Sequence, residues 1–317
     1  MTDFTLIVTG GSGFIGSNLL DMLVEKYKKY YDVKIISIDK RPPDKMFDDV
    51  EYIVEDLADP EFKYINEKPR AVIHLAGSPW SKVKGDQGWL AEADNCFYNN
   101  TVATYNVLSK IRSEKIIFSS SANIYGQGRR MREIHPIQIS SPYGYSKWVC
   151  EEEIRKSGIE YVIYRFGTVI GIRGRTFPNR LVYCAVHGIP IELFNNGKAY
   201  RDLISVHDIC RALISAIYMQ TCEPFENTYN VSMGMEVSGS TIAEIVARTA
   251  TKYGYKLDYS KTPFAPNGYV LESTLNIEKI YKRFGWKPEK NVSTVLDELF
   301  KYYVEPDAKI PPAWESL

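Results

Sequence analysis

The sequence predicts an α/β fold, in which a doubly wound parallel sheet is followed by a smaller C-terminal α+β lobe. Three observations support this prediction. In the first half of the chain, short apolar runs rich in β-branched residues alternate with longer helical patterns, as β-α-β units require. A glycine-rich segment joins the first run to the first helical pattern. After about Gly171 proline, glycine and asparagine become frequent, which predicts a separate lobe.

Each element is expected from the same patterns. In the first half, strands are expected at residues 6–8, 34–38, 52–54, 71–75, 116–119 and 161–165, and helices at 14–30, 89–112 and 142–156. In the second half, we expect strands at 191–194, 203–206 and 228–231, a helix that follows Ser205 or His207 and ends near Gln220, and a helix over 242–253. Thr241 and Glu244 have the spacing of a capping box at the start of that last helix.

The composition excludes several classes of function. The chain has 317 residues, of which 44% are hydrophobic and 25% charged, and 39 basic residues balance 39 acidic ones. No net field gathers nucleic acid or an anionic membrane. No run approaches the roughly 20 apolar residues of a membrane helix, and the first residues do not resemble a secretory signal, so a cytoplasmic location is expected. The five cysteines form no CxxC pair, and neither a disulfide framework nor a metal site is indicated.

The glycine-rich segment has the form of a phosphate cradle. Gly10, Gly13 and Gly16 stand between the first strand and the first helix. Glycines at these places allow a tight turn, a close approach of the backbone to a pyrophosphate, and close packing of helix on sheet, while the helix N-terminus faces the phosphates. We therefore expect a Rossmann-type dinucleotide-binding domain over residues 1–170, to which about 200–225 return, and a substrate-binding lobe over 171–317.

The second strand ends at Asp39, where a carboxylate accepts hydrogen bonds from the ribose hydroxyls of adenosine. Its charge repels the additional phosphate of NADP. Lys40 and Arg41 follow directly and could offset this repulsion, so NAD is favoured over NADP without excluding it. Asp56 and Leu57 follow the third strand and are in a place to meet the adenine.

Tyr143 and Lys147 form the candidate catalytic pair. They are four residues apart on an expected helix, so they share one face, about 5 to 6 Å apart at Cβ. A neighbouring ammonium favours the phenolate and lowers a pKa that is normally near 10. Ser141 and Pro142 have the character of an N-cap and a first helical residue, which puts Tyr143 in the first turn, where the helix dipole also favours negative charge.

The spacing alone is not decisive, because Tyr30 with Lys34 and Tyr64 with Lys68 share it. The first of these pairs straddles the expected end of a helix. Pro69 directly follows Lys68. Neither pair has the setting of Tyr143 at a helix start.

A run of serines follows the strand expected at 116–119. Ligands of this fold class bind at the carboxyl ends of the strands, so these hydroxyls are in reach of both substrate and cofactor. Ser121 is the candidate that hydrogen-bonds the reacting hydroxyl and orients it for hydride transfer.

Together these residues resemble the extended short-chain dehydrogenase/reductase superfamily, in its nucleotide-sugar epimerase/dehydratase family. The resemblance covers nearly the whole chain. Its markers are residues 9–16, Asp39, 56–57, 74–77, 100–104, 119–126, 143–147, 165–171, 201–202, 206–208 and 284–288.

The resemblance implies a role for each candidate. Tyr143 is the acid/base, Lys147 also holds the nicotinamide ribose, and Ser121 assists. The implied cofactor-binding residues are Gly10, Gly13, Phe14, Ile15, Gly16, Asp39, Lys40, Asp56, Leu57, Leu75, Ala76, Gly77, Asn100, Ser119, Tyr143 and Lys147. The implied substrate-binding residues are Lys84, Ser121, Asn123, Thr168, Arg175 and Arg201. Arg201 matches an arginine that grips the diphosphate of the sugar nucleotide, for which a forked guanidinium is suited. The expected partners are a nucleotide sugar and a second copy of the chain, as a homodimer.

Departures from the family pattern bear on the reaction. Members that eliminate water carry an acidic pair where Ala122 and Asn123 stand here, so a dehydratase is disfavoured. Thr168 occupies a place where an asparagine is common, and residues 266–269 lack the usual arginine and aspartate, which puts a second diphosphate clamp in doubt. The serine cluster is most similar to the 4-epimerases. A 4-ketoreductase or a 4-dehydrogenase uses the same residues, a reductase of non-sugar carbonyls stays possible, and a non-catalytic dinucleotide-binding sensor is the remotest alternative.

Overall fold

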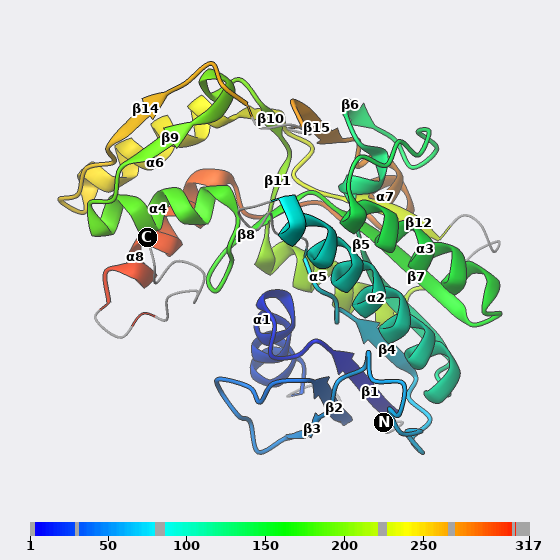
Figure 1. Cartoon of the computed structure of the whole chain (residues 1–317). Helices are drawn as coiled ribbons and strands as arrows, with labels where there is room; N and C mark the ends of the chain where they lie inside the picture. Colours follow the sequence, from blue (N-terminus) through cyan, green and yellow to red (C-terminus); the bar gives the residue numbers. More distant parts are fainter. Residues whose placement is uncertain are drawn as a thin grey trace. The chain divides into compact units, whose positions relative to one another are not determined.

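The computed structural model describes residues 4–28, 32–79, 86–220, 227–265, 270–305 and 308, with the side chains of 86–92 left out (Figure 1). By its contacts the chain divides into two compact units. The first comprises Met1–Gly126, Pro136–Arg165 and Cys210–Tyr229, and the second Gln127–His135, Phe166–Ile209 and Asn230–Leu317. The domain boundaries expected from the sequence stay a prediction. Among the described residues, no helix combines the length and apolar character needed to cross a membrane.

The main sheet has seven strands in the order β12-β7-β5-β4-β1-β2-β3. Their bounds are β1 Phe4–Thr9, β2 Val33–Asp39, β3 Val50–Val54, β4 Ala71–His74, β5 Lys115–Ser121, β7 Glu160–Phe166 and β12 Thr228–Val231. The pairs β1–β2, β2–β3, β1–β4 and β4–β5 are all parallel. From β1 the chain runs one way to β2 and β3, and it then returns to β4 on the other side of β1. In open α/β sheets, ligands bind at the carboxyl ends of the strands at such a reversal.

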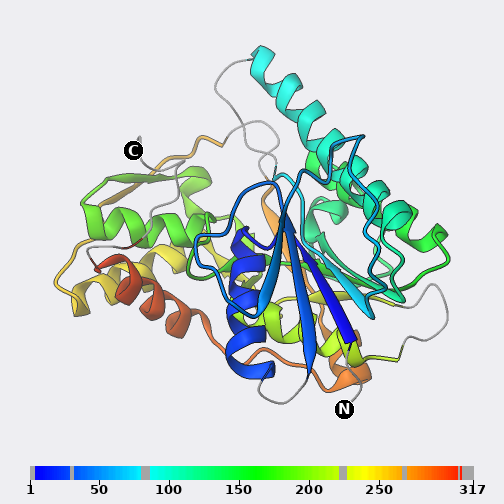
Figure 2. The ribbon, with the colours of Figure 1, turned by 90° about the horizontal axis from the view of Figure 1, so that it is seen from below.

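The helices of the first unit lie on both faces of this sheet (Figure 2). On one face lies α1 (Phe14–Met22), which continues as a π-helical turn, η1 (Leu23–Tyr27). On the other face α2 (Asp86–Lys110) packs along α3 (Pro142–Lys156). The core beneath α2 and α3 is a row of fully buried side chains on neighbouring strands, namely Ile7, Ile36, Val72, Ile116 and Ile163. Such strands are apolar on both faces because helices cover both.

The second unit has a small four-stranded sheet in the order β13-β10-β15-β6 and two further strand pairs, β11-β8 and β14-β9. The strands are β6 Gly128–Met131, β8 Thr168–Ile170, β9 Ile191–Leu193, β10 Tyr200–Arg201, β11 Leu203–Ser205, β13 Val237–Ser238, β14 Tyr259–Lys261 and β15 Glu272–Leu275. Its helix α4 (Phe177–His187) packs against both α6 (Gly239–Lys252) and α8 (Val292–Tyr303). A short helix, α7, spans Glu278–Phe284, and α5 (Val206–Tyr218) links the two units along the chain.

The expected elements of the first half are all present within a few residues of their expected bounds. In the second half, the strand expected at 228–231 is β12, which lies at the edge of the seven-stranded sheet. The capping box expected at Thr241 was wrong. The helix expected over 242–253 begins at Gly239, and its cap is Ser238, whose hydroxyl accepts the N–H of Thr241 at 3.1 Å.

Candidate active site

The glycine cradle joins β1 to α1 at the point where the sheet order reverses. Gly10 has φ +73°, and a Cβ there would lie 2.7 Å from the backbone nitrogen of Ala76. A Cβ on Gly16 would lie 2.1 Å from the carbonyl oxygen of Gly10. Gly13 occupies the N-cap position of α1 and has no side chain with which to cap it. The first N–H groups of the helix are therefore available to phosphate oxygens, as a bound dinucleotide requires.

Asp39 ends β2 beside this cradle and helps to shape it. One carboxylate oxygen accepts the N–H of Ser12 and the other the N–H of Arg41, both at 3.0 Å. Lys40 and Asp56 are both about half-exposed, with 3.9 Å between the ammonium nitrogen and the carboxylate oxygen. The candidates for the adenosine end of a dinucleotide thus lie at the ends of β2 and β3.

The start of α3 is as the sequence predicts. Ser141 is the N-cap, with its hydroxyl accepting the N–H of Gly144 at 3.1 Å, and Pro142 is the first helical residue. Tyr143 therefore lies in the first turn. The ammonium nitrogen of Lys147 lies 5.9 Å from the centre of the Tyr143 ring. Of the two other Tyr/Lys pairs, Tyr64 and Lys68 lie outside any helix, and Tyr30 is outside the described residues.

Burial dominates the electrostatics of this pair. It lowers the pKa of Lys147, whose Nζ donates a hydrogen bond to the carbonyl oxygen of Ser119 at 2.9 Å. Burial also raises the pKa of Tyr143, against the opposing effect of a hydrogen bond with Ser121. The lowered pKa that the sequence predicted for Tyr143 is therefore wrong for the protein by itself, because desolvation of the phenolate outweighs its favourable contacts.

Ser121 lies next to Tyr143. It caps the short helix η2 (Ala122–Tyr125), with its hydroxyl accepting the N–H of Asn123 at 3.2 Å. It also acts on the Tyr143 phenol, whose pKa it lowers against the effect of burial. The first unit thus brings Ser121, Tyr143 and Lys147 together. Asn123 is exposed on η2.

Asn100 of α2 ties the loop after β4 to α3. Its side-chain oxygen accepts the N–H of Ser78 at 2.7 Å, and its amide nitrogen donates to the hydroxyl of Ser146 at 2.8 Å. A Cβ on Gly77 would lie 3.1 Å from that side-chain oxygen and 3.3 Å from the Nζ of Lys147. The loop over 75–77, from which the cofactor candidates Leu75, Ala76 and Gly77 come, therefore lies close to Lys147.

His74 holds the ends of two strands together beneath this loop. Its ring nitrogens lie 2.7 Å from the hydroxyl of Thr9 and 3.1 Å from that of Thr104. Burial, with a contribution from the charge of Lys147, lowers its pKa to about 3. The imidazole is therefore neutral at physiological pH and serves as a hydrogen-bonding bridge.

Three substrate candidates belong to the second unit. Thr168 begins β8, and its N–H donates to the carbonyl oxygen of Asp202 at 2.8 Å. Arg201 lies on β10, where its guanidinium donates to the carbonyl oxygens of Tyr200 at 2.9 Å and Val270 at 2.7 Å. Arg175 is exposed after β8. Lys84 and residues 266–269 lie outside the described residues.

A buried ion pair next to the Tyr/Lys pair was not predicted from the sequence. Glu151, four residues after Lys147 on α3, binds Arg165 of β7 through both carboxylate oxygens. The spacing of four from Lys147 is visible in the sequence. The pairing with Arg165 on β7 is not visible there, because only a tertiary contact brings the two side chains together.

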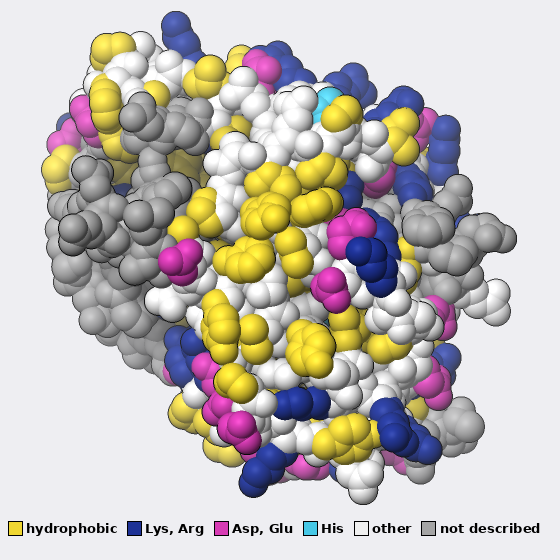
Figure 3. Space-filling view, turned by 45° about the vertical axis from the view of Figure 1, so that its right-hand side comes forward, with side chains coloured by type: hydrophobic (Ala, Val, Ile, Leu, Met, Phe, Trp, Pro, Cys, Tyr) yellow, Lys and Arg dark blue, Asp and Glu magenta, His cyan; other side chains and the backbone are white. Residues whose placement is uncertain are grey.

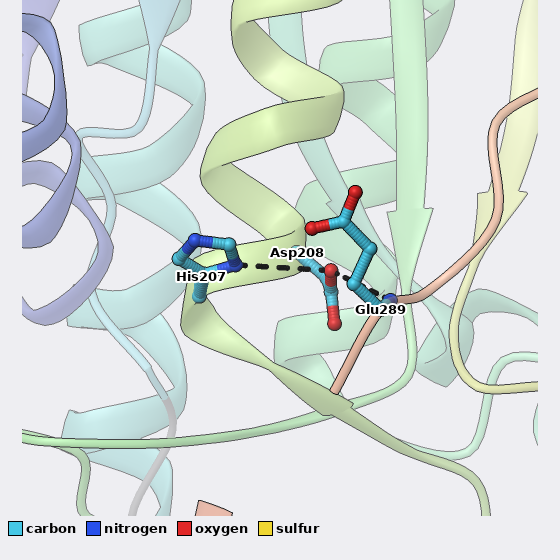
Figure 4. Close-up of side chains that lie close together, drawn as sticks. All are labelled: His207, Asp208 and Glu289. Atoms are coloured by element: carbon cyan, nitrogen blue, oxygen red, sulfur yellow. Dashed lines mark hydrogen bonds and ion pairs between the residues drawn. The ribbon is translucent and has the colours of Figure 1, made fainter. Parts of the chain in front are cut away.

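A cluster of side chains of the types that ligate metal ions lies in the second unit (Figure 4). Among the described residues, only His207, Asp208 and Glu289 group ligand atoms closely enough to hold an ion, within 4.8 Å of one another. The carboxylate of Asp208, however, already accepts the hydroxyl of Ser205 at 2.7 Å and the N–H groups of Glu289 and Lys290 at 3.0 and 3.1 Å. It anchors the segment before α8 to the start of α5, and this role accounts for the cluster.

The sequence matches the model of a known protein family. The NAD dependent epimerase/dehydratase family matches residues 6–232. The chain belongs to this family. The resemblance drawn from the sequence is thereby confirmed.

Relatives along the whole chain agree with the family. A putative UDP-glucose 4-epimerase of Methanocaldococcus jannaschii is 30% identical, with 90% of this chain and 93% of that protein covered. A bifunctional UDP-glucose and UDP-xylose 4-epimerase of Pisum sativum is 29% identical, with 94% and 95% covered.

Solved structures share the fold. A UDP-glucose 4-epimerase of Thermotoga maritima, crystallised with UDP-glucose, has a TM-score of 0.80 at 23% identity over 95% of this chain and 98% of that one. A dTDP-glucose 4,6-dehydratase of Bacillus anthracis, in complex with NAD, has a TM-score of 0.76 at 18% identity over 96% and 97%. The expected fold class is confirmed. Because epimerase and dehydratase share it, the fold does not choose between the family's reactions.

Proposed function

We propose that this protein is an NAD-dependent nucleotide-sugar 4-epimerase. The observation that carries the proposal is the grouping of Ser121, Tyr143 and Lys147 at the carboxyl ends of the parallel strands, beside the glycine cradle. Ala122 and Asn123 stand where a dehydratase carries acids. A site without that acidic pair is suited to moving a hydride and a proton without eliminating water.

The cradle, Asp39 and the loop over 75–77 hold the NAD. Bound NAD supplies the acceptor and later the donor of the hydride at C4 of the sugar. The carboxylate of Asp39 favours NAD over NADP because a 2′-phosphate would be placed against its charge. Lys40 lies toward Asp56 and neutralises that repulsion only in part.

Tyr143 performs the proton transfer. As a phenolate it takes the proton of the C4 hydroxyl while the hydride leaves C4, and as a phenol it returns the proton when the hydride comes back on the opposite face of the 4-keto sugar. The raised pKa of Tyr143 would fall beside the positive charge of an oxidised nicotinamide, since an opposite charge favours the phenolate. Lys147, fixed by Ser119, adds a second positive charge, and Ser121 orients the reacting hydroxyl.

The nucleotide part of the substrate is assigned to Arg201, with Thr168, Arg175 and Lys84 on the sugar and phosphate side. A guanidinium binds a diphosphate through two parallel hydrogen bonds. Two relatives are named for UDP-glucose. UDP-glucose and UDP-galactose are therefore the first substrates to test.

We propose further that the protein is a homodimer that associates through α2 and α3. Hydrophobic side chains gather over the middle of the face that carries these helices (Figure 3). Phe97 stacks on Tyr145 at 5.4 Å between ring centres, and Tyr145 lies 5.8 Å from Trp148. Tyr98, Tyr105 and Tyr145 are 47%, 61% and 46% exposed. Exposed apolar surface of this kind is typical of subunit contacts.

The test is conversion of UDP-glucose to UDP-galactose by the purified protein with NAD, run in D₂O. An epimerase gives product without deuterium at C4 and with no net change in NADH. Tyr143→Phe is expected to lower turnover by about 10²- to 10⁴-fold while NAD still binds. Tyr64→Phe, from the matched pair outside any helix, is the control. Net formation or consumption of NADH would indicate a dehydrogenase or a ketoreductase in place of an epimerase. The proposal is refuted if no nucleotide sugar exchanges a hydride with the cofactor.

A further inference from the structure

Four polar side chains follow one another along one face of α3. Tyr143, Lys147, Glu151 and Arg155 are spaced by four residues, so each lies one turn above the last. In this order, they carry a phenol, an ammonium, a carboxylate and a guanidinium group. Lys147 is 3% exposed and Glu151 is 0% exposed, so the middle two interact away from water.

The carboxylate of Glu151 is completely engaged. One oxygen accepts the hydroxyl of Ser120 at 2.5 Å and the Nε of Arg165 at 2.9 Å. The other accepts Nη2 of Arg165 at 2.6 Å and Nη2 of Arg155 at 2.7 Å. Burial would raise the pKa of Glu151, but the hydrogen bonds and charges of Arg165, Arg155 and Ser120 outweigh it and hold that pKa below its ordinary value.

These contacts fix the segment that carries Ser121. On the side of the strand, Lys147 binds the carbonyl oxygen of Ser119 and Glu151 binds the hydroxyl of Ser120. At the other end, Arg165, itself held by Glu151, donates to the Tyr125 hydroxyl at 2.8 Å. Ser121 lies between these anchors. Its approach to Tyr143 therefore depends on a carboxylate that touches neither of them.

We propose that Glu151 is a positioning residue, which acts through Ser120 to fix Ser121 against Tyr143 and acts on Lys147 to keep its ammonium charged. The inference rests on the proposed function of Tyr143 and Ser121.

The surroundings of Lys147 show why this charge matters. The groups that act on it are Tyr143, Cys150 and Glu151 from α3, Cys96 from α2, His74 from β4 and the Ser119 carbonyl from β5. Burial raises the pKa of both thiols, and His74 is neutral. Glu151 is the only carboxylate in this set, and it offsets part of the effect of burial on Lys147.

Ser120→Ala tests the link to the serine segment without changing a charge. We expect kcat on UDP-glucose to fall at least about tenfold with KM within about twofold, because the orientation of a bound group is lost and not its binding. Ser120→Thr keeps the hydroxyl and should restore most of kcat. Ser157→Ala is the matched control. It removes a hydroxyl at the C-terminal end of α3 that bonds to the backbone of Ile154 and Ile159, so its kcat should stay within about twofold of the wild type.

Glu151→Gln tests the effect on Lys147. Without the carboxylate the ammonium loses its proton at lower pH, so the alkaline limb of the kcat profile should move to lower pH. A merely structural role would lower the melting temperature and leave the profile in place. The inference is overturned if Ser120→Ala keeps wild-type kcat, or if the Glu151→Gln profile superimposes on that of the wild type.

A second readout needs no turnover. The ultraviolet absorbance of NAD-saturated protein, taken as a difference from its Tyr143→Phe counterpart, reports the ionised fraction of Tyr143. The hydrogen bond with Ser121 lowers the pKa of Tyr143, so Ser120→Ala should reduce that fraction at least about twofold near pH 9. An equal fraction in Ser120→Ala and wild type would refute the positioning role. A wild-type protein inactive on every nucleotide sugar would instead refute the proposed function, and the titration would still decide on Glu151.

Discussion

The Nζ of Lys147 lies 2.9 Å from the carbonyl oxygen of Ser119 and donates a hydrogen bond to it. This bond ties α3 to the end of β5, so the ammonium is fixed by the protein itself. A preorganised charge costs no reorganisation when negative charge develops on a neighbouring phenol. Lys147 thus has two functions in the proposed site, one in the fold and one toward Tyr143.

Lys147→Met is expected to lower kcat by about 10²- to 10⁴-fold, the range for losing a group that assists proton transfer. Met retains the apolar stem and loses the charge, so kcat should fall by more than a loss of folded protein explains. The measurement is steady-state kinetics with a thermal melt of the same sample. Lys156→Met, at the exposed end of the same helix, is the control, and equal losses in the two variants would contradict the role of Lys147.

The sequence predicted best where the local chain decides the structure. The start of α3 is exact because Ser141 caps it and Pro142 cannot continue a preceding helix. The central strands β1 and β4 could be predicted because they are largely buried on both faces and therefore apolar. The grouping of Ser121 with Tyr143 follows from the same rules, since both lie where strands or helices meet the carboxyl edge of the sheet.

Long-range contacts explain what the sequence did not predict. The two-residue strands β10 and β13 exist because of long-range pairing, in which Tyr200 lies opposite Ser238 of β13 and opposite Glu272 of β15. That pairing places Ser238 at the entry to α6, and so Ser238 caps the helix where Thr241 was expected. Glu151 and Arg165 meet only because α3 packs on the sheet, which no local pattern shows.

His74 should make stability depend on pH. Its pKa is about 3 in the folded protein and about 6.5 in the unfolded chain, so the unfolded state binds the proton first. The stabilisation is complete above pH 6.5 and is lost as the pH falls toward 3, at about 1.4 kcal/mol per pH unit. Burial raises the pKa of Asp202 to about 7, which gives an opposite slope between about pH 4 and pH 7 in wild type and variant alike. Urea unfolding of wild type and His74→Gln at pH 7 and pH 5 therefore checks the contribution of His74 as the difference between the two proteins. His74→Gln should lose the His74 contribution, so its stability relative to the wild type should rise as the pH falls from 7 to 5, whereas His187→Gln, at the end of α4, should follow the wild type.

Asp39 should control the choice of cofactor. In Asp39→Asn the negative charge is lost while an oxygen remains to hold the cradle. NADH affinity is expected to fall about tenfold, as for a lost charge-assisted hydrogen bond, and NADPH affinity to rise. Fluorescence titration with each cofactor measures both. Asp49→Asn, whose carboxylate pairs with Lys28, controls for the change in net charge, and an unchanged ratio of the two affinities in Asp39→Asn would argue against contact with the ribose.

Tyr105→Glu should dissociate the proposed dimer. The change puts a charge at the most exposed of the three tyrosines on the α2 and α3 face, and burying it unpaired in an interface costs several kcal/mol. Sedimentation equilibrium should show a dissociation constant at least about 100-fold higher than that of the wild type. Tyr281→Glu on α7, which is similarly exposed at 55%, should leave the association unchanged. A wild-type protein that sediments as a monomer at micromolar concentration would rule out the homodimer.

Gly10→Ala tests whether glycine is required at this position by the close approach of Ala76 as well as by the left-handed backbone angle. Gly10 and Gly158 have almost the same backbone angle, φ +73° and +75°, but only at Gly10 does a Cβ meet another atom, the backbone nitrogen of Ala76 at 2.7 Å. Both alanine variants carry the cost of a left-handed residue, about 1–2 kcal/mol. Gly10→Ala must in addition push the cradle away from the loop over 75–77, so it should be the less stable variant and should bind NADH at least about tenfold more weakly. Gly158→Ala should lose stability alone. If both variants bind NADH as the wild type does, the close approach at Gly10 does not shape the cofactor site.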